Sequence, residues 1–185
     1  MYTKELTNLL KKSDCIYVLK SDDKIYVLSD VMLCVMDALD YAKFVQKITL
    51  HAPPENGKGF EIRNSILSEL PEDRHKYVRS ICNRFKPLDQ QGTRTDLIIA
   101  KDPKSKEAPR PYLFSDYAVY VSENVDKCFD FTAKVDISAV EGNKFAVYIS
   151  SKEKYAAVMG RKIKTDKLKT DVESLLKVLC AGETT

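Results

Sequence analysis

The sequence predicts an α+β fold in which a unit of one helix and three strands occurs twice, in a largely antiparallel sheet, with a helix near the C-terminal end. Two observations lead to this expectation. The stretch IYVLSDVMLCV, residues 25–35, is followed 86 positions later by PYLFSDYAVYV, residues 111–121. The same order of predicted elements surrounds each stretch, and this agreement carries more weight than the few identical residues.

The first unit is assigned to residues 1–72. Leucines at positions 6, 9 and 10 recur at helical spacing, so residues 3–12 are expected to form a short amphipathic helix. Two runs rich in Ile, Val and Tyr then flank a polar turn at 21–23, which is typical of a β-hairpin. The chain turns again at Ser29-Asp30 into the apolar run VMLCVM. HAPPENGKG, residues 51–59, is expected to form an exposed loop.

The second unit opens with PEDRHKYVRSICNRF, which has a proline and two acids at a helix start. One face of this helix carries apolar residues at Tyr77, Val78, Ile81, Cys82 and Phe85. Strands are predicted for DLIIAK, residues 96–101, and within RPYLFSDYAVYVS, residues 110–122. The connector KDPKSKEAPRP, residues 101–111, is predicted to be exposed, because its prolines lack a backbone donor and its charges are costly to bury.

The remainder extends the sheet, so that residues 73–185 hold the second unit, a meander and the last helix in one compact body with the first unit. Residues 134–160 alternate apolar and polar positions with two turn signals, which predicts a meander of about three strands. For the last helix, Thr170 and Glu173 form a capping box and Gly182 suits the exit. Its apolar face would consist of Val172, Leu175, Leu176 and Leu179.

Composition indicates a cytoplasmic protein without a membrane span. The chain has 185 residues, of which 44% are hydrophobic, so it can bury a substantial core. It contains no run of 18 apolar residues, and its first residues do not have the pattern of a secretory signal. The cysteines are odd in number and far apart, which is typical of reduced core residues: Cys15, Cys34, Cys82, Cys128 and Cys180.

No catalytic residue, metal ligand or cofactor site is predicted, and the chain is not expected to be an enzyme. Close cysteine pairs of the kind that hold zinc are absent from the sequence, and NGKGF does not have the pattern of a phosphate-binding loop. His51 and His75 have no identifiable catalytic partner and are expected at the surface. Asp30 and Asp116 are interpreted as turn formers, because Asp and Ser side chains bond nearby backbone N–H groups.

Charge is distributed unevenly along the chain. Residues 1–73 carry 9 Lys/Arg against 12 Asp/Glu, whereas residues 74–110 carry 10 against 4 and residues 152–177 carry 8 against 4. On each predicted helix the face opposite the apolar stripe carries basic and amide side chains: Lys4, Asn8 and Lys11 on the first, and Lys76, Arg79, Asn83 and Lys86 on the second. Such a face is either simply solvated or contacts nucleic-acid phosphates.

The doubled unit, with an Asp at the bend between long strands and basic helix faces, resembles the DNA sliding clamps and their small phage-encoded relatives. In that family the bend commonly reads Thr-Asp-Gly, where this chain has Ser29-Asp30-Val31 and Ser115-Asp116-Tyr117. The resemblance implies a non-catalytic processivity protein on duplex DNA. Several subunits would close a ring by pairing edge strands, with helices inward and the seven basic and amide residues facing the DNA backbone. A polymerase or other replication protein would dock a peptide in an apolar outer groove.

A second hypothesis belongs to a different class of protein. The chain could be a small α+β protein-interaction module, such as a phage or mobile-element inhibitor that occupies a site on a host protein, with charged loops providing specificity. A ring-sized oligomer in gel filtration would favour the clamp, and a monomer that does not retain DNA would favour the inhibitor.

Overall fold

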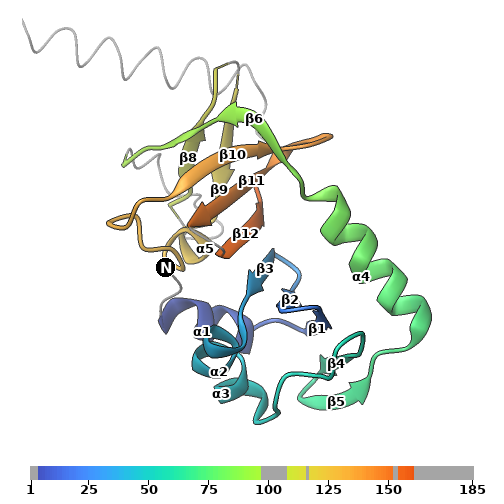
Figure 1. Ribbon diagram of the computed structural model, residues 1–185. Helices are drawn as coiled ribbons and strands as arrows, with labels where there is room; N and C mark the ends of the chain where they lie inside the picture. Colours follow the sequence, from blue (N-terminus) through green and yellow to red (C-terminus); the bar gives the residue numbers. More distant parts are fainter. Residues whose placement is uncertain (1–3, 97–107, 116, 152–153, 161–185) are drawn as a thin grey trace, which may run out of the picture.

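The computed structural model in Figure 1 describes residues 4–96, 108–115, 117–151 and 154–160. The predicted helix over 170–182, most of the predicted strand over 96–101 and Asp116 lie outside these ranges. The described helices are α1 Lys4–Lys11, α2 Ala38–Phe44, α3 Gln46–Thr49, α4 Glu72–Arg84 and α5 Glu123–Asp126. None of these helices is long and apolar enough to cross a membrane.

The strands form two antiparallel sheets, which confirms the α+β class and the antiparallel pairing. The large sheet has nine strands in the order β5-β4-β1-β2-β3-β12-β11-β10-β6, and the small one has the order β7-β8-β9. The strands are β1 Cys15–Ser21, β2 Lys24–Leu28, β3 Met32–Met36, β4 Gly59–Arg63, β5 Ile66–Glu69, β6 Pro87–Gln91, β7 Thr93–Arg94, β8 Arg110–Leu113, β9 Ala118–Val121, β10 Asp136–Val140, β11 Asn143–Ser151 and β12 Lys154–Met159.

Local sequence signals account for the first half of the large sheet. The α1 helix and the β1–β2 hairpin form where they were predicted, and Asp22 takes a positive φ of 55° in the hairpin turn. The β4–β5 hairpin turns at Asn64 and Ser65, whose φ values of 50° and 63° match the two positive values of a type I′ turn. The predicted meander is confirmed as β10, β11 and β12.

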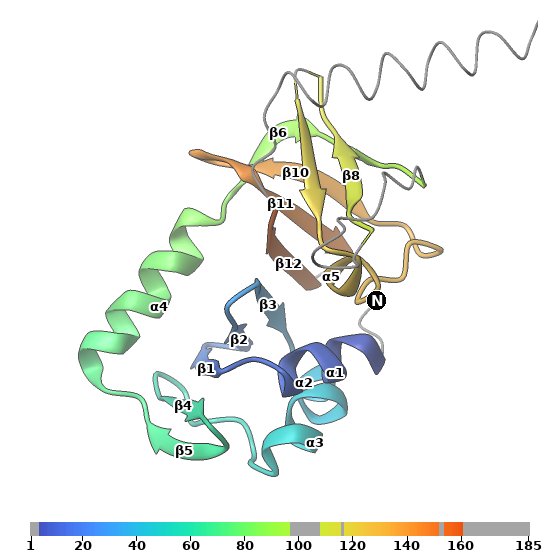
Figure 2. The same ribbon diagram turned by 180° about the vertical axis from the view of Figure 1, so that it is seen from behind.

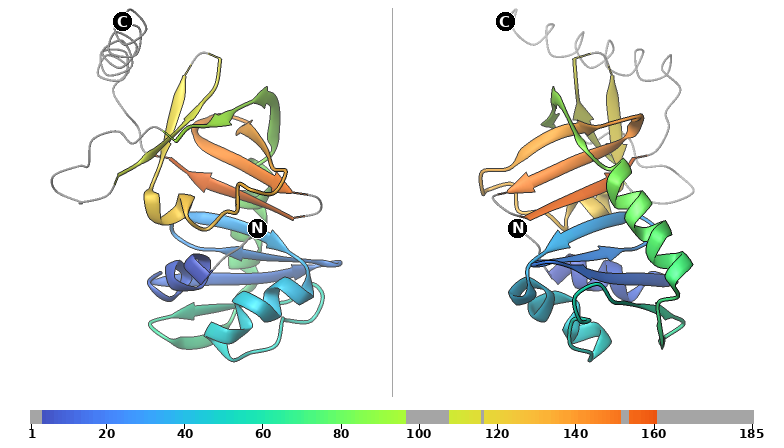
Figure 3. Two further views of the ribbon diagram at one scale, coloured as in Figure 1. Left: turned by 90° about the vertical axis from the view of Figure 1, so that its left-hand side faces the viewer. Right: turned by 45° about the vertical axis from the view of Figure 1, so that its right-hand side comes forward.

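Alternation along the strands gives the large sheet two apolar faces. The α1 face presents residues such as Val18, Val27 and Cys34 to helices α1, α2, α3 and α5 and to the small sheet. The α4 face presents residues such as Leu19 and Val35 to α4, which crosses from the β5 edge of the sheet to the β6 edge. Figures 2 and 3 show α4 alone on its side, with the other described helices on the opposite side.

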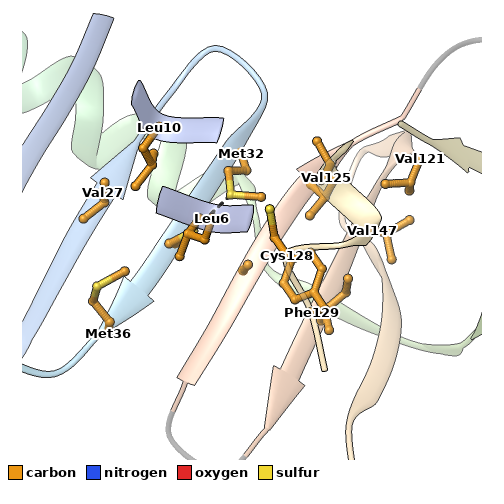
Figure 4. Packing of buried hydrophobic residues seen from close by; sticks show 14 of the residues in the cluster. Leu6, Leu10, Val27, Met32, Met36, Val121, Val125, Cys128, Phe129 and Val147 are labelled. Atoms are coloured by element: carbon orange, nitrogen blue, oxygen red, sulfur yellow. Dashed lines mark hydrogen bonds between the residues drawn. The ribbon is translucent and has the colours of Figure 1, made fainter. Parts of the chain in front are cut away.

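The two halves of the chain join at the middle of the large sheet, where β3 pairs with β12 in the register Cys34↔Ala156. Figure 4 shows Met32 and Leu6 of the first half pointing toward Cys128 of the second. Asp40 of α2, with a side chain only 5% exposed, forms an ion pair with Lys154 of β12. Hydrogen bonding, apolar burial and a shielded ion pair therefore all connect the halves.

The predicted repeat is not confirmed. Four described strands, β6 to β9, follow α4 where three follow α1, and the two predicted units do not pack in the same way. The α1 helix packs on the face of the large sheet that carries Val18, whereas α4 lies on the opposite face of the same sheet and not on β8 and β9. The residues that the sequence match aligns also do not occupy equivalent positions in the two hairpins. Leu28 and Leu113 are the last paired residues before the two bends and lie 85 positions apart, one fewer than the sequence match implies.

The connector prediction is wrong at its end. Ala108 is 5% exposed and Pro111 is buried in β8, while residues 101–107 lie outside the described ranges. The ladder between β7 and β8 ends at the Arg94–Tyr112 pair, so the missing N–H of Pro111 removes no bond to β7. The prediction relied on composition alone. Composition does not show that the last residues of the charged segment belong to a strand.

Asp126 of α5 anchors the small sheet to the rest of the second half. Its carboxylate accepts hydrogen bonds from Nε and Nη2 of Arg94 at 2.7 and 2.8 Å and from the Tyr112 hydroxyl at 2.9 Å. Burial raises the pKa of the Tyr112 hydroxyl, which keeps it a donor. Hydrogen bonding to Asp126 likewise raises the pKa of the Arg94 guanidinium. The buried carboxylate is thus held by three charge-assisted bonds.

We expect Asp126→Ala to lower the free energy of unfolding by about 3–5 kcal/mol, because it removes the buried carboxylate that pairs with the partly buried Arg94 guanidinium. Asp96→Ala is the matched control, since Asp96 also pairs with Arg94, at 2.6 Å, but has a side chain 92% exposed. The control should leave stability nearly unchanged. Urea unfolding followed by circular dichroism measures both variants, and equal losses would contradict the role assigned to Asp126.

Candidate interaction surfaces

The α1 face carries the first group of predicted DNA-binding residues. Lys4, Asn8 and Lys11 are all exposed on α1, because Leu6 and Leu10 turn the opposite side of the helix into the core. Lys12 follows directly and is also exposed. The neighbouring helices α2 and α3 add exposed lysines at positions 43 and 47. The lysines therefore spread over three adjacent helices rather than along a single ridge.

A polar cavity of about 440 Å³ lies beside the end of α1. It is lined by the C-terminal end of α1, the end of α3 and the β4–β5 turn, with side chains that include Lys11, Lys12, His51, Asn64 and Ser65. His51 is exposed, as predicted. Asp14 also lines this cavity, so its charged groups are of both signs, with Lys11 and Lys12 as the cationic donors that can contact an anionic group.

The α4 helix carries the second group. Lys76, Arg79 and Asn83 are exposed on α4, as predicted from the helical spacing, whereas Lys86 is exposed but lies beyond the end of the helix at Arg84. The buried side of the helix is formed by Val78, with partly buried side chains at Ile81, Cys82 and Phe85. Tyr77, which was expected on this apolar face, is instead 47% exposed.

The structure does not bring the two groups together. Since α1 and α4 lie on opposite faces of the large sheet, Lys11 and Lys76 are separated by its full thickness. A single straight duplex cannot contact both groups of one chain. Sequence periodicity gave each helix face correctly but contained no information on which side of the sheet each helix would lie.

An apolar groove of about 460 Å³ lies between α4 and the large sheet. Its lining consists of Asp14, Cys15, Tyr17, Leu28, Ser29, Asp30, Tyr77, Ile81, Phe85 and Met159. Tyr77 meets the Tyr17 ring edge to face, with ring centroids 6.4 Å apart. Met159 is 40% exposed, and the two aspartates supply negative charge at the groove. Apolar walls with charge beside them are typical of peptide-binding grooves.

Residues at the β1 end of the groove form a polar cluster. The Cys15 thiol donates to Oε1 of Glu61 at 3.6 Å, and the same carboxylate oxygen accepts from Nε of Arg63 at 2.7 Å. Arg63 also donates to the Tyr17 hydroxyl at 3.4 Å. Burial raises the pKa of the Cys15 thiol above its ordinary value. The cluster therefore holds Cys15 in its thiol form and fixes the orientation of Tyr17.

The predictions for the first bend and for His75 are each only partly correct or wrong. At the first bend the hydrogen bonds come from Ser29, whose hydroxyl accepts from the Met32 amide at 3.3 Å, while Asp30 is exposed. Ser29, rather than the aspartate, therefore stabilises this turn. His75 is partly buried, and its Nε2 has no hydrogen-bond partner among the described residues, so the prediction of a surface histidine is wrong there.

Within the described ranges, no group of three His, Cys, Asp or Glu side chains is arranged to hold a metal ion. Comparisons with protein-family models, with curated proteins and with solved structures find no match to this chain. The groove was not predicted from the sequence because its lining comes from four separate parts of the chain. The one local signal was the apolar face of α4, which extends to Tyr77. This face is wider than the part of the helix that packs on the sheet.

We expect thiol alkylation to distinguish the cysteines. Cys34 and Cys128 are fully buried, and burial raises the pKa of Cys82 to about 12. At pH 8 the Cys82 thiolate is then present at only about one part in ten thousand, since each pKa unit is a factor of ten. Of the four cysteines in the described ranges, Cys15 should therefore react first with iodoacetamide. Its rate should increase as the pH rises, because its raised pKa leaves mostly thiol at neutral pH.

Peptide mapping by mass spectrometry after timed labelling measures each site separately. Denatured protein is the control, in which all cysteines should react alike. Labelling of Cys34 as fast as Cys15 in the native protein would contradict the closed core.

Proposed function

We propose that this protein is a non-catalytic, sliding-clamp-like scaffold that holds duplex DNA on its α1 face and a replication protein on its α4 face. The observation that carries the proposal is the placement of a group of exposed lysines and an apolar groove on opposite faces of one sheet. Both surfaces can then be occupied at the same time. A processivity protein needs this property and needs no catalytic residue or cofactor.

The α1 face suits DNA better than the α4 helix does. Its exposed lysines lie on three neighbouring helices, so they form a surface that can follow a phosphate backbone. The ammonium groups of Lys4 and Lys11 would neutralise phosphates, and Asn8 would donate a neutral hydrogen bond. Contacts of this kind do not read sequence. The basic residues of the α4 segment instead lie along a single helix or just past its end, and Lys76, Arg79 and Lys86 do not line the groove.

The α4 groove suits a peptide from a partner protein. Tyr17, Tyr77 and Phe85 provide aromatic walls, and aromatic residues are enriched where proteins bind one another. Asp14 and Asp30 favour a peptide with basic residues next to its apolar anchors. The partner class in this proposal is a polymerase or another replication protein.

The β5 edge of the large sheet is a candidate site for pairing between subunits. All four residues of β5 are exposed, and Ile66 is 70% exposed. In the hairpin, Leu67 sits at a position whose backbone N–H and C=O point away from β4. An exposed apolar edge with unpaired backbone groups is a ready template for another strand.

The second candidate function is the protein-interaction module that inhibits a host protein. The placement of the α1 and α4 basic faces on opposite sides of the sheet favours it, because the seven residues cannot act together on one duplex. In that case the groove and the basic face of α4 would bind the host protein, and DNA would play no part.

Charge reversal on each face tests the DNA proposal. The variant Lys4→Glu, Lys11→Glu, Lys12→Glu should lose at least about 30-fold in affinity for duplex DNA at low salt. The slope of log affinity against log salt should fall by about 0.9 for each phosphate that the variant no longer neutralises. Fluorescence anisotropy with two unrelated duplex sequences measures both quantities, and the two sequences should bind alike.

The matched control is Lys76→Glu, Arg79→Glu, Lys86→Glu, which changes charge by the same amount on the opposite face. It should keep its DNA affinity and its fold, because exposed substitutions change stability by only about 0.5 kcal/mol each. Loss of binding in this control alone would place DNA on α4 and remove the proposed partner site. Absence of DNA binding by the wild type would replace the clamp with the interaction module.

Pairing between subunits through β5 predicts that the wild type elutes from gel filtration as an oligomer and that Leu67→Pro elutes as a monomer. Proline removes the outward N–H of this position without removing a hydrogen bond to β4. Leu67→Ala is the control that keeps the N–H, and it should stay oligomeric. A monomeric wild type at micromolar concentration would exclude a ring.

A further inference from the structure

The described chain ends beside the α4 groove. Met159 is the last residue of β12 and lines the groove, and Gly160 follows it. A Cβ at Gly160 would collide with the Val119 side chain and the Phe145 carbonyl oxygen, so the backbone fits only without a side chain. The Gly160 amide donates to that same carbonyl oxygen. Gly160 is therefore held against β9 and Phe145, one residue after Met159, whose side chain lines the groove.

The sequence beyond this point matches the groove in chemistry. Residues 161–170, RKIKTDKLKT, carry five Lys/Arg and one Asp. Apolar residues then follow at helical spacing, at Val172, Leu175, Leu176 and Leu179. A basic stretch followed by an apolar stripe complements an apolar groove flanked by aspartates.

We propose that this tail, residues 161–185, docks in the α4 groove of its own chain. The leucines of the tail would contact Tyr77 and its neighbours, and the basic stretch would lie beside Asp14 and Asp30. The tail then competes with any partner peptide. The competition with a partner peptide rests on the proposed function, in which the groove is the partner site. The docking of the tail does not depend on that function.

Tethering makes a weak contact effective. Thr170 lies ten positions after Gly160, and a random-coil linker of that length would have ends about 18 Å apart. Such a linker gives an effective concentration on the order of 1 mM. If the isolated tail binds with a Kd of about 0.1 mM, the tethered tail weakens a competing ligand about tenfold.

The test uses the full chain and a fluorescein-labelled peptide of residues 161–185 as the probe, with Cys180→Ser to prevent oxidation. The tail variant Leu175→Asp, Leu176→Asp, Leu179→Asp should bind this peptide about tenfold more tightly than the wild type, whose own tail competes. Adding Tyr77→Asp to the tail variant should weaken peptide binding at least tenfold. Because Tyr77 is 47% exposed, this change should leave the fold intact.

Leu39→Asp in the tail variant is the matched control, since Leu39 is 64% exposed and lies on α2, on the other face of the sheet. It should not change peptide affinity. A second control peptide with the three leucines replaced by serine keeps the charges and should not bind. It separates groove docking from simple attraction of a basic peptide.

Equal peptide affinity in the wild type and the tail variant would overturn the proposal, as would binding that Tyr77→Asp does not affect. Competition that grows with protein concentration would place the tail in the groove of a second copy and would overturn docking within one chain. The titration contains neither DNA nor a partner protein. Its failure therefore leaves the DNA proposal standing, and loss of DNA binding leaves this result unaffected.

Discussion

The pairing of β3 with β12 is the contact on which the rest of the architecture depends. It joins five strands from the first half and four from the second into one sheet. Because the sheet is continuous, each of its faces draws apolar residues from both halves, and neither half has to cover a sheet edge at the junction. The helices of the α1 face and the α4 helix can then lie on opposite sides of a single sheet. This sheet determines the positions of the groove and of the exposed lysines.

Local features of this fold could be predicted from the sequence because short-range chemistry determines them. Leucine spacing determines α1, and turn residues with alternating strands determine the β1–β2 hairpin and the meander. The β6 segment, PLDQQ, has no alternation, and its strand form comes from pairing with β10. The pairing of β3 with β12 joins residues about 120 positions apart, and nothing in either segment identifies its partner.

The candidate site could be predicted only in part, for the same reason. Exposure of the basic residues on α1 and α4 follows from helical periodicity, which each helix carries within itself. The side of the sheet on which a helix lies depends on how the chain connects one edge of the sheet to the other. No local sequence pattern indicates that connection. Asp40 and Asp126 resemble surface acids in the sequence, yet both are buried against cations from distant strands. Tyr77 lies in the groove because α4 crosses the strand that carries Tyr17.

The position of β12 also affects how the chain folds during synthesis. It is the last strand of the described chain to leave the ribosome, yet it fills an interior place between β3 and β11. Until it arrives, β3 presents Leu33 and Val35 on an open edge. At about 5–20 residues per second, the roughly 120 residues in between take on the order of ten seconds to make. The nascent chain therefore exposes an apolar strand edge for that time, and the final sheet can close only after translation of its second half.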